Sequence, residues 1–233
     1  MKKRKLFTLL TIFLLIPATL FLGTKLPGRA HYLTSTLIIL EILIPFFLLF
    51  EKRKPQAREL VVIAVMSALA FASRAAFAAV MYFKPISAII MLSGIALGPE
   101  AGFVVGAISL FASNFLFGQG PWTPWQMMAY GLGGYVSGWL YRKKWLTSDP
   151  PSLAFFAFFC IMLLVGPLLD TCSVFTMLTR LTPAAVLSVY GAGVPVNLIH
   201  AACAALTMLL VSKPLLSKLH RVKEKYGMLE ERL

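Results

Sequence analysis

Three charged residues lie inside long apolar segments of this chain, namely Glu41, Arg74 and Asp170. Because a charge within a membrane is costly, each is a candidate for function. Arg74 and Asp170 both fall in the predicted outer half of their segments, at similar depth. They could contact a ligand in a polar pocket open to the exterior, or form a buried ion pair that only fixes helix packing. Glu41 has no obvious partner, and we expect a structural role for it.

Uncharged polar residues gather at the same predicted level. Asn114 closes one apolar segment, and residues 119–126 are expected to form an outer loop with two tryptophans. The tryptophans could anchor the chain at the interface, but the prolines and glycines around them favour a lid over a planar or amphipathic ligand. Asn197 and His200, three residues apart, share a helical face. The candidate substrate-binding residues are therefore Arg74, Asn114, Gln119, Trp122, Trp125, Gln126, Asp170, Asn197 and His200.

The sequence contains no recognisable catalytic motif. It lacks a His-Glu-x-x-His zinc motif, a Gly-x-Ser-x-Gly elbow, a phosphate-binding loop and a second carboxylate near Asp170. Cys160, Cys172 and Cys203 have neither metal-ligand nor disulfide spacing, so we expect them to be buried small hydrophobic residues. We therefore expect no enzyme, no metal site and no cofactor.

A stripe of alanines lies in the apolar segment 59–80, where one recurs every four residues: Ala64, Ala68, Ala72 and Ala76. Small residues at this spacing let membrane helices approach closely. Arg74 projects about 140° away from the centre of the stripe, at about 100° per residue. The alanine face could pack against another helix of the same chain or dock a separate membrane protein.

The composition shows which elements must position these residues. The chain has 233 residues, of which 59% are hydrophobic and only 13% charged, against about 45–50% and 25% in soluble domains. No strand-like alternation competes with the apolar runs, so we predict an all-α polytopic membrane bundle. The apolar segments are 6–22, 32–50, 59–80, 83–97, 101–117, 127–141, 152–178 and 184–212.

The segment 83–97 is the weakest of the predicted spans. Its uninterrupted apolar run, Ile86 to Leu97, covers only about 18 Å at 1.5 Å per residue. A hydrocarbon core is about 30 Å thick. The segment is therefore expected to be tilted, packed inside the bundle, or extended by the residues before it.

The net charge of +13 has a topological explanation. Cytoplasmic loops of membrane proteins collect Lys and Arg, so we predict a multi-pass protein of the cell membrane with both termini cytoplasmic and no nucleic-acid partner. Most of the 22 basic residues lie in four clusters on the predicted inner side, at positions 2–5, 52–58, 142–144 and 213–232.

Residues from about 58 to 211 resemble the substrate-binding S-components of energy-coupling factor (ECF) vitamin transporters. The stretches that carry the resemblance are Arg58-Glu59-Leu60 with the alanine stripe, Lys84-Pro85, Gly94 to Gly102, and Gly118 to Met127. The last stretch is most like the cobalamin-specific branch. The resemblance implies a six-helix bundle that binds a vitamin from outside. It also implies docking of Ala64, Ala68 and Ala72 on a transmembrane coupling subunit that two ATPases drive.

These expectations divide the chain into two additional N-terminal transmembrane helices (1–56), a six-helix substrate-binding core (57–212) and a basic cytoplasmic tail (213–233). The expected function is capture of a vitamin, with cobalamin or a related large cofactor as the best guess. The alternative is a self-sufficient, proton-coupled secondary transporter of a small metabolite, in which Asp170 or His200 relays protons.

Overall fold

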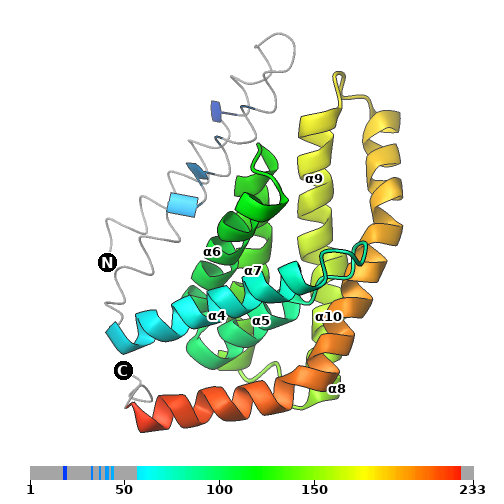
Figure 1. The fold of residues 1–233 in the computed structure, drawn as a ribbon. Coiled ribbons are helices and arrows are strands. Elements are labelled where there is room, and N and C mark those ends of the chain that lie inside the picture. The colour runs from blue at the N-terminus through cyan, green and yellow to red at the C-terminus, as the bar shows by residue number, and fades with distance from the viewer. Residues whose placement is uncertain are drawn as a thin grey trace.

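The computed structural model describes residues 57–226, together with Ala18, Thr19, Leu33, Leu37, Leu40, Glu41, Leu43 and Ile44. Within 57–226 the regular structure is entirely helical (Figure 1). The predicted spans 6–22 and 32–50 lie outside the described residues except at those single positions. The helices are α4 (Ala57–Ala76), α5 (Ile86–Leu97), α6 (Pro99–Phe117), α7 (Trp122–Arg142), α8 (Pro150–Cys160), α9 (Gly166–Met177) and α10 (Pro183–Lys225).

Four stretches of the described part are long and apolar enough to cross a membrane. They are Ala57–Ala76, Pro99–Phe117, Pro150–Met177 and Pro183–Lys225. This confirms the predicted fold class, a polytopic helical membrane bundle. Counting α8 and α9 as one interrupted helix, six helical units make up residues 57–226.

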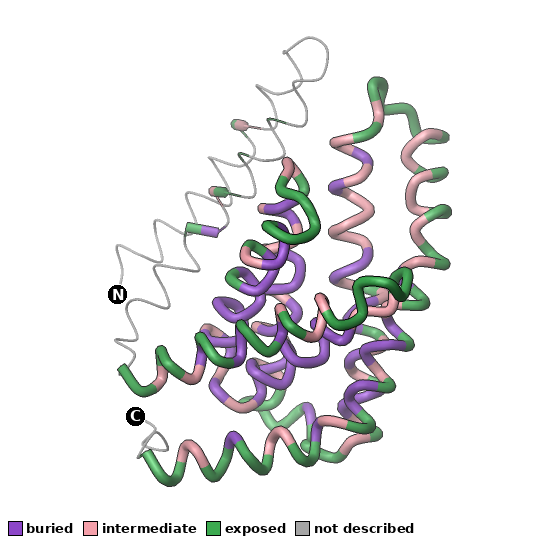
Figure 2. Tube along the Cα trace, viewed as in Figure 1, coloured by how far each residue is buried: buried purple, intermediate pink, exposed green. Residues whose placement is uncertain are grey.

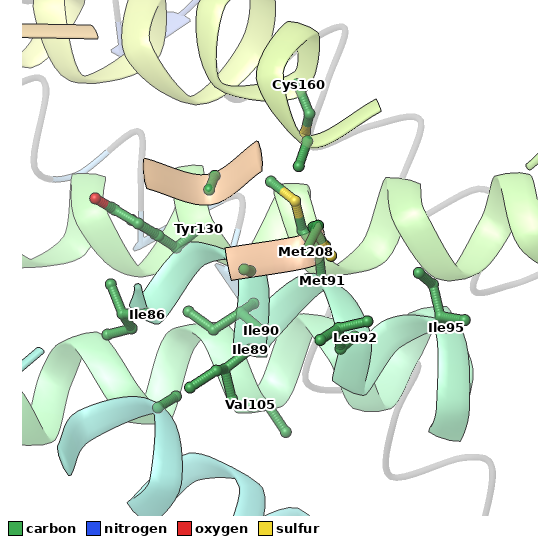
Figure 3. Packing of buried hydrophobic residues seen from close by; sticks show 14 of the residues in the cluster. Ile86, Ile89, Ile90, Met91, Leu92, Ile95, Val105, Tyr130, Cys160 and Met208 are labelled. Carbon is green, nitrogen blue, oxygen red and sulfur yellow. The ribbon is translucent and has the colours of Figure 1, made fainter. Parts of the chain in front are cut away.

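Helix α5 lies at the centre of the bundle. Every residue in it except Ala96 is buried, and it contacts α4, α6, α7 and α10. Figure 2 shows its buried trace behind the largely exposed α4. Figure 3 shows the α5 isoleucines beside Val105 of α6, Tyr130 of α7 and Met208 of α10. Of the alternatives for the short segment 83–97, packing inside the bundle is the one observed.

Glycines allow α5, α6 and α7 to pack almost backbone to backbone. A Cβ atom at Gly102 would lie 2.5 Å from the Cα of Gly94 and 2.6 Å from the carbonyl oxygen of Gly134. A Cβ atom at Gly106 would lie 2.7 Å from the Cα of Gly131. Ordinary carbon contacts are about 3.5–4.0 Å, so no larger residue fits at either position without a shift of the helices.

The predicted segment 152–178 is one helical path with a π-helical stretch, Ile161–Val165, between α8 and α9. Pro167 follows directly after this stretch, in the first turn of α9. A proline lacks the N–H group and its ring clashes with the carbonyl four residues earlier, here that of Leu163. The wider π turn accommodates this proline and resets the rotation of α9 relative to α8.

Helix α10 continues beyond the predicted end of its span at residue 212 and reaches Lys225. Pro195 and Pro214 interrupt its hydrogen-bond ladder, and its last part runs across the end of the bundle where α4 begins (Figure 1). There Arg58 donates a hydrogen bond of 2.6 Å to the Tyr226 carbonyl. The first half of the predicted tail is therefore helical and attached to the core.

Candidate functional site

Arg74 lies in the last turn of α4 and reaches toward the end of α6. Its Nη1 atom donates hydrogen bonds to Ser113 Oγ at 2.5 Å and to Asn114 Oδ1 at 2.9 Å. The guanidinium carbon lies 4.5 Å from the ring centroid of Phe117, a cation–π contact. The side chain is half-buried, so its charge is held at the rim of the bundle by neutral groups.

Asn114 connects three helices through its amide. The residue is 1% exposed, and while its oxygen accepts from Arg74, its Nδ2 atom donates to Thr123 Oγ1 at 2.9 Å and Gln126 Oε1 at 2.8 Å. Thr123 in turn donates to Gln119 Oε1 at 2.9 Å. Of the candidate residues, the structure therefore brings Arg74, Asn114, Gln119 and Gln126 together in one network where α4 and α6 end and α7 begins.

The expected loop over 119–126 is shorter than predicted, because α7 already begins at Trp122. Pro121 precedes the helix with φ −61°, a value that suits a helix start. The backbone N–H of Gly120 donates to Thr123 Oγ1 at 3.3 Å, which ties the loop to the first turn. Trp122 and Gln126 are therefore helical residues whose positions are set by α7.

The two tryptophans have different environments. Trp125 is 5% exposed and stacks on Phe175 of α9, with ring centroids 6.0 Å apart. Trp122 is exposed, packs against Gly120 and donates from Nε1 to the Gly118 carbonyl at 3.3 Å. Trp125 is thus part of the core between α7 and α9, and only Trp122 lies on the surface where a lid would be.

Asp170 forms a second polar centre with Asn197. Asn197 Nδ2 donates to Asp170 Oδ2 at 2.8 Å, joining α9 to α10. Glycines make room for both side chains: a Cβ at Gly166 would lie 2.6 Å from Asn197 Cγ, and one at Gly193 would strike the Asp170 carboxyl. No ion pair joins Arg74 to Asp170 within the described residues, so the interpretation of these two as a buried salt bridge is wrong.

The turn between α4 and α5 brings a second cation beside Arg74. Lys84 Nζ donates to the carbonyl oxygens of Phe77 at 2.5 Å, Val80 at 3.0 Å and Ala78 at 3.1 Å. The same ammonium lies 5.9 Å from the Phe117 ring centroid.

His200 of α10 contacts this turn through Tyr82. Tyr82, which has a positive φ of 59°, meets the His200 ring edge-on with centroids 6.2 Å apart. The turn therefore links the end of α4 to α10 above the centre of the bundle.

A scan against protein families matches residues 54–217 to a model described as "ECF-type riboflavin transporter, S component". The chain belongs to this family of S-components. The match covers all the helices described here up to the last turns of α10 and every candidate site residue. No curated protein and no solved structure matches the chain.

The alanine face of this S-component is exposed. Ala64, Ala68 and Ala72 are all exposed on α4. The interpretation in which this face packs against the chain's own helices therefore does not hold within the described structure. An open apolar groove of about 440 Å³ runs along it, lined by Leu60, Ile63, Ala64, Ser67, Ala68, Phe71, Val104, Ile108 and Ala112.

Four residues of the site were missed from the sequence: Lys84, Ser113, Phe117 and Thr123. Lys84 could have been found, since it is the only charged residue between Arg74 and Glu100. The other three are common residue types in a membrane bundle, and only their contacts with Arg74, Lys84 and Asn114 single them out.

Glu41 lies outside the range matched to the S-component family. Its Oε1 atom accepts a hydrogen bond of 2.8 Å from Thr19 Oγ1. Two residues further on, Leu43 is buried in a cluster with Phe103 and Trp125. Leu43 therefore packs against the core, whereas the recorded hydrogen bond of Glu41 is to Thr19 and its Oε2 atom is buried without a partner among the described residues.

Proposed function

We propose that this S-component captures a vitamin at the polar network around Arg74 and Asn114. The observation that carries the proposal is the family match, because residues 54–217 include every residue of the network. The geometry supports it, since the ends of three helices supply hydrogen-bonding groups around one half-buried cation. Small-molecule sites generally combine mostly apolar walls with a few precisely placed polar groups of this type.

The exposed alanine face of α4 is the proposed docking surface for the coupling subunit. Ala64 and Ala68 line an apolar groove and Ala72 continues the face, and small side chains let a partner helix approach closely in lipid. Two ATPases would drive transport through that subunit. No residue that lines the groove takes part in the Arg74–Asn114 network, so each can be altered separately.

Two vitamins have support as the ligand. The matched family is named for riboflavin, whereas the stretch from Gly118 to Met127 resembles the cobalamin-specific branch. Riboflavin is the first ligand to test because the family match covers most of the chain, and cobalamin is the second.

The direct test is binding of riboflavin and cobalamin to the purified full-length chain in detergent, measured by isothermal titration calorimetry. Saturable binding of either vitamin supports the proposal, and binding of neither contradicts it. Uptake into proteoliposomes is then measured with and without the coupling subunit and ATPases. Uptake by the chain alone, abolished by collapsing the proton gradient, would instead support the secondary transporter and a relay role for Asp170 or His200.

A further inference from the structure

Two cations flank a single aromatic ring at the outer rim of the site. The guanidinium carbon of Arg74 lies 4.5 Å and the ammonium of Lys84 5.9 Å from the centroid of Phe117. They come from different elements, the last turn of α4 and the turn before α5. Arg74, Lys84 and Phe117 are called the paired-cation site below.

The paired-cation site has no carboxylate partner among the described residues. Arg74 donates only to the neutral oxygens of Ser113 and Asn114. Lys84 donates only to backbone carbonyls. The nearest candidate from the sequence, Asp170, is engaged by Asn197 instead.

Neutral partners do not balance two positive charges of this kind. A guanidinium has five N–H donors, and the two recorded hydrogen bonds of Arg74 both come from Nη1. The Phe117 ring offers only a weak cation–π attraction, and the carbonyls that accept from Lys84 belong to Phe77, Ala78 and Val80 in the turn after α4. Burying a charge without a counter-charge is unfavourable; Arg74 is half-buried, and Lys84 beside it adds a second positive charge rather than a negative one.

We propose that the ligand of this S-component is a form of the vitamin that carries an anionic oxygen group, a phosphate or a carboxylate, which binds between Arg74 and Lys84, so that a phosphorylated flavin is favoured over riboflavin itself. This inference rests on the proposed function and names the substrate class of the same site. Arginine is suited to such groups because its planar donors match two oxygens at once, and Lys84 adds a point charge. The phosphate of a lipid headgroup has the same chemistry and is the competing source of the anion.

The experiment compares two flavins that differ by one phosphate, riboflavin and flavin mononucleotide. Their affinities for the purified full chain in neutral detergent are measured by quenching of flavin fluorescence. We expect the wild-type protein to bind flavin mononucleotide at least about tenfold more tightly, since a charge-assisted hydrogen bond is worth about 1.5–3 kcal/mol. Equal affinities, or a preference for riboflavin, would overturn the proposal.

Variants assign the preference to the paired-cation site. Arg74→Gln and Lys84→Gln should each bring the ratio of the two affinities to within about threefold of unity, whereas Arg74→Lys should keep part of it. The ratio is insensitive to a general loss of binding, because such damage lowers both affinities. Lys218→Gln, which removes an exposed charge on α10, is the matched control and should leave the ratio unchanged. A ratio that persists in both Gln variants of the site would contradict the proposal.

A second measurement does not depend on the vitamin. Inorganic phosphate should raise the melting temperature of the detergent-purified protein relative to chloride at equal ionic strength, and Lys84→Gln should abolish the rise. If phosphate raises the melting temperature but no vitamin binds, the anion site is supported and the proposed function is rejected. If a vitamin binds but there is neither a phosphate effect nor a flavin preference, the proposed function is supported and the anion site is rejected. The same measurement is made in nanodiscs of anionic phosphatidylglycerol and of zwitterionic phosphatidylcholine. If the phosphate effect is lost only in phosphatidylglycerol, the site binds a lipid headgroup, and the proposal is overturned.

Discussion

The close contact between α6 and α7 positions the polar network, and a single methyl group placed there should disturb both stability and binding. In Gly106→Ala, the new Cβ would lie 2.7 Å from both the Cα and the N atom of Gly131 and 2.8 Å from the Tyr130 carbonyl carbon. All three are backbone atoms, so no side chain can rotate away. Reaching an ordinary contact of about 3.5 Å requires the helices to separate by about 0.8 Å.

The magnitude follows from two opposing effects. Overpacking costs about 1–3 kcal/mol, and we take the upper end because the clash is with the backbone. Replacing glycine by alanine inside a helix returns about 1 kcal/mol, which leaves a net loss of about 2 kcal/mol. For a chain of this size that lowers the melting temperature by about 4–8 °C.

Gly133→Ala, on the same helix α7 but facing α5 and the π-helical stretch, is the matched control. Its Cβ would meet the methyl groups of Val165 at 3.3 Å and Met91 at 3.5 Å, which are ends of movable side chains. We expect its melting temperature to be unchanged or to rise by up to about 4 °C, from the gain in helix propensity.

Both variants are assayed by thermal unfolding in detergent and by vitamin binding. Only Gly106→Ala should also weaken binding, because separating α6 from α7 stretches the bonds from Asn114 to Thr123 and Gln126. If Gly106→Ala melts like the wild type, or if the two alanine variants lose the same stability, the argument from backbone contact is wrong.

Three further predictions concern single side chains. Asn114→Ala removes three hydrogen bonds of a buried amide, so vitamin affinity should fall on the order of a hundredfold by calorimetry, at about 1 kcal/mol for each of the three bonds; affinity within threefold of wild type would contradict the network. Ala68→Leu fills the groove on α4, so it should leave vitamin binding intact while reducing co-purification with the coupling subunit; unchanged co-purification would reject the docking face. Hydrogen bonds from Thr147 and from the N–H of Ser152 hold the pKa of Asp149 below its usual 3.8. The ionised carboxylate therefore stabilises the folded protein above pH 3.8, and this stabilisation is lost as the pH falls through the folded-state pKa. Asp149→Ala should remove this acid-dependent part of the melting curve, and an unchanged pH profile would show that Asp149 does not stabilise α8 as its N-cap residue.

Depth along a helix was predictable from the sequence, because each residue adds about 1.5 Å. The level shared by Asn114, Gln119, Gln126 and Arg74 was found in this way, and the structure joins these residues in one network. The short run Ile86–Leu97 was also recognised as unusual, and its central position explains it.

Rotation about the helix axis and the choice of neighbours were not predictable. Arg74 and Asp170 share a depth, but Arg74 faces α6 and Asp170 faces α10. The π-helical stretch before α9 changes the direction of Asp170, and no periodicity rule locates such a stretch in advance. Trp125 was placed in a loop whose shape Pro121 and Pro124 were expected to set, yet prolines are also suited to the first turn of a helix.

Arg74 and Asp170 are both held by a neutral side chain rather than by an opposite charge, so each charge can still interact with a ligand. Each pairs with an asparagine, Arg74 with Asn114 and Asp170 with Asn197. A carboxamide has both an acceptor and a donor end, so it can hold either sign of charge in place without neutralising it. A direct ion pair between Arg74 and Asp170 would have neutralised both charges. Because the two residues do not pair, the guanidinium keeps its field at the rim beside Lys84, where a bound anion would supply the missing counter-charge.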